Sequence, residues 1–475
     1  MPRSLNILFL ASEAEPFVKI GGLADVAGSL PLALRALPDD PRLDVRLVLP
    51  LHQSMRGNIA NLIPGVEFPV LRNGTNIPAQ IFAGELKDMP VYFIAGGPVT
   101  EATAVYSNDL AFDREKYTFF SLAVLEMTRH LGWRPDILHA NDWHTALTLY
   151  ALRARQSDPF FAGMKSVLTL HNLPYMGGDG SEQLAAYGLS PLADNTLPRW
   201  AHTQPLPLGL WAADALVAVS PTYAQEILTP KFGCGLQNFL QSRQAAFSGI
   251  LNGLDTASWD PLTDPALATN FDAPSLHSRP LNKAALQERL GLHNDPDLPL
   301  LAMVGRIDPQ KGVDIVLDAL RQVVDLSWQV VILGKGDASL EDGARRLEAD
   351  FPGRVRAVIA YDAPLGRLIY GGADIFLMPS RYEPCGLAQM IAMRYGCVPV
   401  VRATGGLKDT VEDGRTGFLF EAASPEALVE ALRRALAAYP EQEKWKKLQR
   451  NGMKQDFSWT KSARQYLAIY QSLTR

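Results

Sequence analysis

Cysteine is scarce in this chain, with three residues in 475, at Cys234, Cys385 and Cys397. Three cysteines at these distances form neither a disulfide framework nor a metal-binding motif, which indicates a reducing compartment. Long apolar runs are missing too, since none approaches the ~20 residues of a membrane-spanning helix. The short apolar stretch at the start is followed at once by Glu13 and Glu15, unlike a signal peptide. We therefore expect a cytoplasmic protein without a membrane partner.

An excess of positive charge is also absent. The formal net charge of −5 argues against a nucleic-acid partner, because such binding needs a basic face. No GxxxxGK[ST] phosphate loop and no HxxxH or CxxC pair occurs, which excludes a P-loop kinase and predicts no bound metal. With 47% hydrophobic and 20% charged residues, the composition is that of a globular protein, long enough for two or three domains.

Short apolar runs alternate with helical patterns over nearly the whole length, which is typical of α/β layers built on parallel sheets. Strands are expected in a first series at 7–11, 45–49, 91–94, 137–140, 167–170 and 216–219, and in a second at 300–304, 330–333, 355–358, 375–378 and 398–401. The stretch 252–280 between the two series is rich in Asp, Pro, Asn and Ser, as a domain boundary or hinge would be. The pattern predicts two doubly wound domains with a deep ligand cleft between them.

The segment FVKIGGLADVAG, residues 17–28, joins the first expected strand to a helix, because apolar residues recur at helical spacing after the glycines. Gly21 and Gly22 would present unpaired backbone N–H groups at the helix N-terminus, where the dipole favours an anion. Lys19 would add a mobile positive charge there. The alternative is a tight strand-to-helix turn with a solvated lysine.

An echo of this segment, GGLKDTV at 405–411, occurs in the second half, again after a strand and with a base, Arg402, just upstream. Two such helix N-termini would suit a ligand with two phosphates. In a chain with 37 glycines, chance could also produce one such echo.

Other loops at expected strand ends carry polar residues. Arg306 and Lys311 lie between a strand and a helix that begins near Gly312, and they either neutralise a departing diphosphate or are two solvated cations. Glu383, at the expected start of a helix, either binds sugar hydroxyls or interacts with the helix dipole. Cys385 is expected to be a small packed residue and not a nucleophile.

Three first-half residues, Asp142, His144 and His171, follow expected strands and should occupy loops at the cleft. For Asp142 and His144, helix capping and hydrogen bonding explain the residue types as well as catalysis does. His139 lies within an expected strand, and we interpret it as a core histidine.

Taken together, these motifs resemble bacterial glycogen synthases and plant starch synthases, the family-five retaining glycosyltransferases that use ADP-glucose. The resemblance extends from Ile7 to about Leu473 and follows the family's order. It is carried by VKIGGLADV, HANDWHT, TLHNLPY, VAVSPTYAQEI, GILNGLDTASWDP, GRIDPQKG, ADIFLMPSRYEPCGLAQMIAMRYG and VVRATGGLKDTV.

The resemblance implies a GT-B fold, in which two Rossmann-like doubly wound domains face each other across a deep cleft. Residues 1–252 would form the acceptor-side domain, 253–458 the nucleotide-sugar domain, and 459–475 a helix crossing back to the first. The implied reaction transfers the α-glucosyl group of ADP-glucose to the 4-hydroxyl at the non-reducing end of an α-1,4-glucan, such as glycogen or a maltooligosaccharide. ADP is released with retention of configuration, and neither a metal nor a cofactor takes part. The oligomeric state stays open.

Five positions of this chain match the family's residues around the reacting groups. Arg306 and Lys311 would hold the donor phosphates, Glu383 would bind hydroxyls of the transferred glucose, and Asp142 and His171 would lie beside the reacting sugar. The further donor contacts that the resemblance implies are Lys19, Gly21, Gly22, Asp25, Tyr361, Cys385, Gly386, Thr404, Gly405 and Gly406. The tyrosine of this set would stack on adenine.

The chain departs from the family's pattern in a few places. HNLPYMGG at 171–178 and Pro207 within 206–214 alter first-domain loops, and Arg367 stands where many relatives have histidine. The position eight residues after Glu383, which is acidic in many related transferases, is Ile391 here. With no obvious second carboxylate in the sequence, the resemblance favours same-face attack within an ion pair over a covalent intermediate. The alternatives are a UDP- or GDP-glucose enzyme of the same fold, a transferase with another acceptor, a phosphorylase, and a silent protein that binds glucan or nucleotide sugar.

Overall fold

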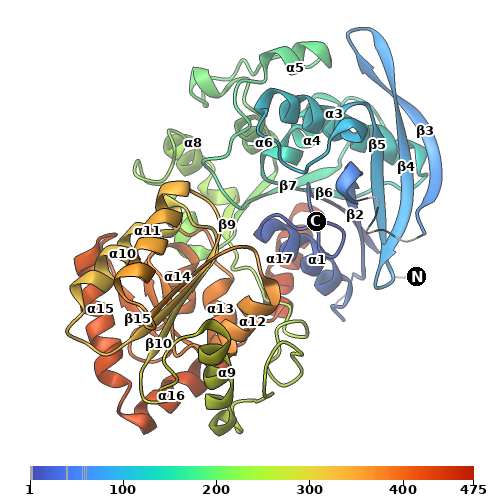
Figure 1. Cartoon of the computed structure of the whole chain (residues 1–475). Helices are drawn as coiled ribbons and strands as arrows, with labels where there is room; N and C mark the ends of the chain where they lie inside the picture. Colours follow the sequence, from blue (N-terminus) through green and yellow to red (C-terminus); the bar gives the residue numbers. More distant parts are fainter. Residues whose placement is uncertain (1–3, 39–40, 56, 58, 60) are drawn as a thin grey trace. The chain divides into compact units, whose positions relative to one another are not determined.

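The structure, a computed structural model, describes residues 4–38, 41–55, 57, 59 and 61–475. It divides into two compact units (Figure 1), the first made of Met1–Gly253 with Trp459–Arg475 and the second of Leu254–Ser458. Each unit is built on one sheet and the helices that connect its strands. No helix among the described residues is long and apolar enough to cross a membrane.

The first sheet contains every strand that the sequence predicts for the first half. Among the described residues it has nine strands, in the order β3 (Ile63–Arg72), β4 (Thr75–Leu86), β5 (Met89–Gly96), β2 (Leu43–Pro50), β1 (Leu5–Leu10), β6 (Ile137–Asn141), β7 (Lys165–Leu170), β8 (Ala215–Ala218) and β9 (Phe247–Gly249). Along this order, every strand from β5 through β2 and β1 to β9 runs parallel to its neighbours in that stretch. Strands β1, β6, β7 and β8 are almost fully buried, which explains the short apolar runs that mark them in the sequence.

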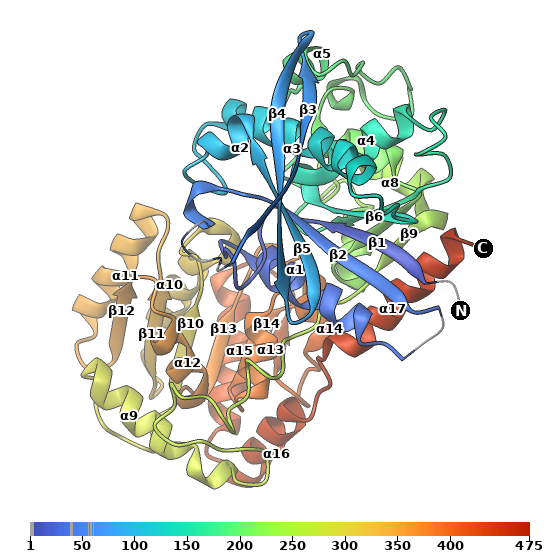
Figure 2. The same cartoon turned by 90° about the vertical axis from the view of Figure 1, so that its right-hand side faces the viewer.

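The antiparallel hairpin β3–β4 at one edge of this sheet is absent from the sequence-based prediction (Figure 2). Its turn is Asn73–Gly74, with φ of 50° and 73°. Asn-Gly is the preferred pair for a two-residue hairpin turn, so the sequence did carry a signal for it. Lys87 and Asp88, with φ of 47° and 66°, make a second tight turn that leads from β4 into β5.

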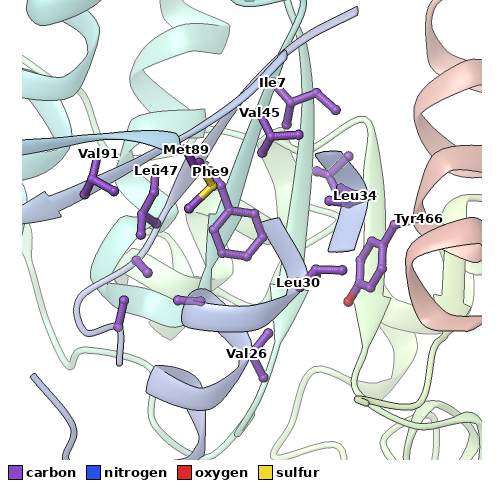
Figure 3. Close-up of a cluster of buried hydrophobic side chains, with 14 of the residues drawn as sticks. Ile7, Phe9, Val26, Leu30, Leu34, Val45, Leu47, Met89, Val91 and Tyr466 are labelled. Atoms are coloured by element: carbon purple, nitrogen blue, oxygen red, sulfur yellow. The ribbon is translucent and has the colours of Figure 1, made fainter. Parts of the chain in front are cut away.

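Helices of the first unit include the first and the last long helices of the chain. The described helices here are α1 (Gly22–Arg35), α2 (Gly97–Glu101), α3 (Leu110–His130), α4 (Asp142–Ala154), α5 (Ser181–Ala186), α6 (Pro205–Ala212), α7 (Pro221–Glu226), α8 (Gln237–Ser242) and α17 (Trp459–Leu473). Helices α1 and α17 pack against each other. Figure 3 shows Phe9 of β1 with Leu30 of α1 and Tyr466 of α17 in the core that these elements share.

A buried histidine ties the last helix to the sheet. His139 of β6 is fully buried, and its ring nitrogens lie 2.6 Å from the Tyr470 hydroxyl and 2.7 Å from the Thr169 hydroxyl. Burial lowers the pKa of His139 to about 3, so the ring is neutral. The prediction of a core histidine is confirmed.

The second unit contains every strand predicted for the second half. Its described strands run parallel in the order β12 (Val355–Ile359), β11 (Gln329–Gly334), β10 (Leu300–Val304), β13 (Ile375–Met378), β14 (Val398–Arg402) and β15 (Phe418–Phe420). The connecting and flanking helices are α9 (Pro280–Leu290), α10 (Val313–Gln322), α11 (Ala338–Asp350), α12 (Ala363–Gly372), α13 (Ala388–Arg394), α14 (Gly405–Thr410), α15 (Pro425–Ala438) and α16 (Gln442–Met453).

Both sheets have a point at which the direction of strand addition reverses. In the first unit β2 and β6 flank β1, and in the second β11 and β13 flank β10. In open parallel sheets, ligands bind beyond the carboxyl ends of the strands at such a switch point. The loops after β1, β6 and β7, and those after β10, β13 and β14, are therefore where a site is expected.

The variant Tyr470→Phe is expected to destabilise the first unit, because it removes the hydroxyl partner of buried His139. A buried polar group left unsatisfied costs about 1–3 kcal/mol, so the melting temperature should fall by several degrees. Tyr175→Phe is the control, since Tyr175 is 53% exposed. Scanning calorimetry measures both, and equal melting temperatures would contradict the role given to Tyr470.

Candidate functional site

The loop after β1 carries a lysine held by two carboxylates. Lys19 Nζ lies 2.7 Å from Asp25 Oδ1 and 2.9 Å from Glu15 Oε2. Burial raises the pKa of Asp25 to about 6, although Lys19 opposes this shift. Burial acts to lower the pKa of Lys19, but Asp25 and Glu15 outweigh it and the net shift is upward. Lys19 is thus a paired cation in this structure and not the mobile charge that the sequence predicts.

A buried carboxylate holds the backbone just before α1. Glu13 Oε2 accepts hydrogen bonds from the N–H groups of Ile20 (2.5 Å) and Gly21 (3.0 Å), while Oε1 accepts one from the Tyr106 hydroxyl (3.0 Å). Burial raises the pKa of Glu13, and these three donors favour its ionised form. The expectation of an unpaired N–H is wrong for Gly21, whose amide is occupied by Glu13. Gly22 is the first residue of α1.

Asp142 and His171 meet where β6 and β7 end. Asp142 is buried, has a φ of 52°, and accepts hydrogen bonds at Oδ1 from the backbone N–H groups of His171 (2.7 Å) and Asn172 (3.3 Å). His171 Nε2 lies 2.9 Å from Asn141 Oδ1. Burial raises the pKa of Asp142 to about 7 and lowers that of His171 to about 3. The structure therefore brings together two residues that the sequence assigns to one site, and it makes the histidine neutral.

His144 does not lie in a loop, contrary to expectation. It belongs to the first turn of α4 and is buried, and Asp142, also expected in a loop, is the first residue of that helix. Its ring centroid lies 4.7 Å from that of Tyr117 and 4.8 Å from that of Tyr106. Burial, with a smaller contribution from Lys116, holds the pKa of His144 well below its usual range. The His144 ring therefore packs on Tyr106, whose hydroxyl donates to Glu13.

In the second unit, Lys311 and Glu383 are in contact. They follow β10 and β13, the neighbouring strands at the switch point. Lys311 Nζ lies 2.7 Å from Glu383 Oε2, which also accepts a hydrogen bond from Ser380 Oγ at 2.9 Å. Glu383 is only 5% exposed. Burying a carboxylate is costly unless it is paired and hydrogen-bonded, and Lys311 and Ser380 are the partners that offset this cost.

Arg306 lies on the same loop and keeps most of its exposure. Its side chain is 57% exposed and lies 2.6 Å from Asp308 Oδ2, and it donates to Gln310 Oε1 at 2.9 Å. Asp308 also accepts a hydrogen bond from the Lys311 N–H at 2.9 Å. One carboxylate therefore orients both cationic residues, and the guanidinium stays accessible to an anion.

Glu383 lies in the loop before α13, so its predicted place at the start of a helix is wrong. Two glycines of α14 pack directly on this loop. A Cβ at Gly405 would lie 1.9 Å from the Glu383 carbonyl oxygen, and one at Gly406 would lie 2.1 Å from that of Cys385. The Gly406 N–H donates to the Glu383 carbonyl at 3.1 Å. That amide is thus used inside the protein, where the sequence predicts a phosphate contact.

Arg402, the base upstream of the second glycine pair, supports the loop from within the unit. It is 6% exposed and donates to the backbone carbonyls of Ser380, Arg381 and Glu421. It is therefore not a counterpart of Lys19, and the echo between the two halves does not extend to the bases. Sequence reasoning missed this bracing role, because the carbonyls it binds lie in another loop.

The remaining predicted donor contacts lie on the second unit. Tyr361 follows β12 and is 86% exposed, whereas Cys385 is 5% exposed and Thr404 is fully buried. Gly386 has a φ of 75°. The packed state predicted for Cys385 is confirmed, and ligand contacts at these four positions stay predictions.

Groups of three or more His, Cys, Asp or Glu side chains able to hold a metal do not occur in the part of the chain that the structure describes. Each unit has a cation beside a carboxylate at the carboxyl edge of its parallel strands. Such pairs can bind an anionic group with the cation and hydroxyl groups with the carboxylate.

Comparisons with known proteins find relatives over nearly the whole chain. Residues 6–242 match the family described as starch synthase catalytic domain, and residues 287–452 match glycosyl transferases group 1. The chain is 43% identical to the glycogen synthase of Syntrophotalea carbinolica, with 98% of each chain covered. It is 40% identical to that of Desulforudis audaxviator, with 99% of this chain and 96% of the relative covered.

Solved structures of glycosyltransferases are also similar to this chain over its whole length. The catalytic domain of starch synthase IV from Arabidopsis thaliana, bound to ADP and acarbose, is 33% identical, with a TM-score of 0.90 and 100% of both chains covered. Sucrose-phosphate synthase from Thermosynechococcus elongatus is 20% identical, with a TM-score of 0.63 and 99% of both chains covered, and it supports the fold alone. The predicted GT-B fold class, with two Rossmann-like α/β units, is confirmed.

The variant Asp142→Asn is expected to change how stability depends on pH. The folded pKa of about 7 lies above the ordinary value near 3.9. The folded state therefore binds the proton more tightly, and the stability gained is lost as pH rises from about 4 through about 7. Because asparagine does not titrate, the difference in melting temperature between the variant and the wild type should shift in favour of the variant from pH 5 to pH 8. Calorimetry at both values tests this, and a difference that does not change with pH would contradict it.

Proposed function

Because the chain belongs to the glycogen synthase family of retaining glucosyltransferases, we propose that it extends α-1,4-glucans with ADP-glucose as donor. The glucosyl group passes to the 4-hydroxyl at the non-reducing end of glycogen or a maltooligosaccharide, and ADP leaves. The names of the relatives and the ligands of the Arabidopsis structure support this choice. We assign the acceptor side to residues 1–252, the nucleotide-sugar side to 253–458, and the reaction to the cytoplasm.

The contact between Lys311 and Glu383 is the observation that carries the proposal. When the glycosidic bond breaks, negative charge builds on the diphosphate and oxocarbenium character on the glucose ring. Lys311 and Arg306 neutralise the diphosphate, and Glu383 accepts hydrogen bonds from glucose hydroxyls while it keeps Lys311 oriented. Because the pair is already in place, little reorganisation is needed as charge develops.

On the first unit, we assign Asp142 and His171 to the neighbourhood of the reacting sugar. A neutral His171 can exchange hydrogen bonds with sugar hydroxyls without adding positive charge beside an oxocarbenium-like ring. Asp142 positions His171 through its backbone N–H. The ADP part is assigned to Lys19, the Gly21–Gly22 turn and Asp25, and on the second unit to Cys385, Gly386 and Thr404–Gly406.

Retention is proposed to proceed by same-face attack within an ion pair. A double displacement needs a nucleophilic carboxylate on the opposite face of the sugar. The position where related transferases have an acid is Ile391, which is 6% exposed and packed in α13. An apolar side chain there supports a route in which departing diphosphate and incoming hydroxyl share one face.

The donor base is the least constrained part of the proposal. Tyr361 is proposed to stack on adenine, and an aromatic ring that is 86% exposed can stack on any base. UDP- or GDP-glucose is therefore the second candidate. A silent binding protein is disfavoured, since Lys19, Arg306, Lys311 and Glu383 are all present.

The first test compares ADP-, UDP- and GDP-glucose with a maltooligosaccharide acceptor, following nucleotide release and product length together. Growth of the glucan strongest with ADP-glucose is the expected result. Growth with another donor would move the protein to the second candidate. Binding of nucleotide sugar without transfer from any donor would contradict the enzyme assignment.

The variant Lys311→Ala should lower kcat by about 100-fold or more, the usual effect of removing one preorganised donor to a developing anion. Lys408→Ala is the control, because Lys408 is an exposed lysine of the same unit. Steady-state rates with ADP-glucose measure both. A Lys311 variant as active as the Lys408 variant would remove the main support for the proposed site.

A further inference from the structure

Glu15 is a second anionic partner of Lys19 that no predicted contact includes. Its Oε2 lies 2.9 Å from Lys19 Nζ. The side chains of Glu15, Lys19 and Asp25 are 50%, 34% and 20% exposed. The single ammonium is therefore shared between one half-exposed and one more buried carboxylate.

The backbone fixes where Glu15 stands. Its N–H donates to the Ala24 carbonyl in α1 at 3.1 Å. Its own carbonyl packs against Gly28 of the same helix, where a Cβ would lie 2.4 Å from the oxygen. Because both peptide groups of Glu15 are held against α1, its carboxylate is kept within reach of Lys19 and does not depend on a flexible loop.

The result is a crowded set of negative charges around one cation. Glu13 occupies the Ile20 and Gly21 amides, and Glu15 and Asp25 occupy the ammonium. A diphosphate that binds Lys19 meets these carboxylates at close range. Each like charge at such distances opposes binding, even in a water-like dielectric.

We propose that Glu15 sets the affinity for the donor, because it competes with the diphosphate for the Lys19 ammonium. This rests on the proposed function, in which Lys19 binds the diphosphate. The diphosphate replaces Glu15, and not Asp25, as a partner of Lys19, because Glu15 is the more exposed of the two carboxylates. An exposed ion pair contributes little free energy, so Glu15 turns toward water at small cost while Asp25 retains the lysine.

The test is Glu15→Gln, with ADP binding measured by calorimetry and donor kinetics measured in parallel. Removing one charge near the diphosphate should tighten ADP binding about 3- to 10-fold. The donor KM should fall by a similar factor, with kcat within about 2-fold, because the competition affects binding only. Raising the salt concentration should shrink the gain, since exposed charges are screened.

Glu182→Gln is the matched control, because it removes an equal charge from an exposed position on α5 of the same unit. It should leave ADP affinity unchanged. An equal gain in both variants would mean that net charge alone is responsible, and would overturn the proposal. Weaker ADP binding by Glu15→Gln would overturn it too, since Glu15 would then orient Lys19 for the ligand.

Lys19→Ala separates the inference from the proposed function. If Lys19→Ala weakens ADP binding and Glu15→Gln does not tighten it, the inference fails and the assignment of Lys19 stands. If Lys19→Ala leaves ADP binding unchanged, the assignment of Lys19 fails and the inference fails with it. Absence of ADP binding by the wild type would overturn both.

Discussion

Parallel strands impose the constraint on which the rest of the molecule depends, because the loop after every strand emerges at the same edge of its sheet. Lys311 and Glu383 are 72 positions apart in the chain, yet their charged atoms lie 2.7 Å apart, since β10 and β13 are neighbours. Asp142 and His171 meet for the same reason after β6 and β7. The reversal of strand order then selects which of the loops along this edge have room for a ligand.

Carboxylates of the same unit balance the cations at these edges. Asp25 and Glu15 bind Lys19, Glu383 binds Lys311, and Glu13 binds backbone amides in the same manner. Where such pairs are exposed they add little to stability, so their main effect is on orientation. They keep long side chains in a restricted arrangement, and they also compete with any anion that binds there. The same few carboxylates thus orient the two lysines and oppose the binding of an anion to them.

Buried strands were predictable because short, mainly apolar runs mark them, and every strand inferred from such a run is present. The hairpin β3–β4 is largely exposed and lacks that signature, so only its turn at Asn73–Gly74 marks it. The loops that carry the candidate residues followed from the strand ends. The partners of these residues could not be predicted in the same way. Glu13 binds backbone amides and Arg402 binds backbone carbonyls, and these groups occur at almost every position of a sequence. Likeness to a family, and not local sequence patterning, suggested the roles of the site residues.

The position of α17 has a consequence for synthesis of the chain. This helix supplies Tyr466 and Tyr470 to the core of the first unit, but it is translated after the whole second unit. The ribosome must first make residues 254–458, which takes roughly 10–40 s at typical elongation rates. Throughout that interval the nascent first unit presents the apolar surface that α17 later covers. A message truncated between the codons of the second unit and those of α17 would therefore yield a folded second unit joined to a first unit that recruits chaperones or aggregates.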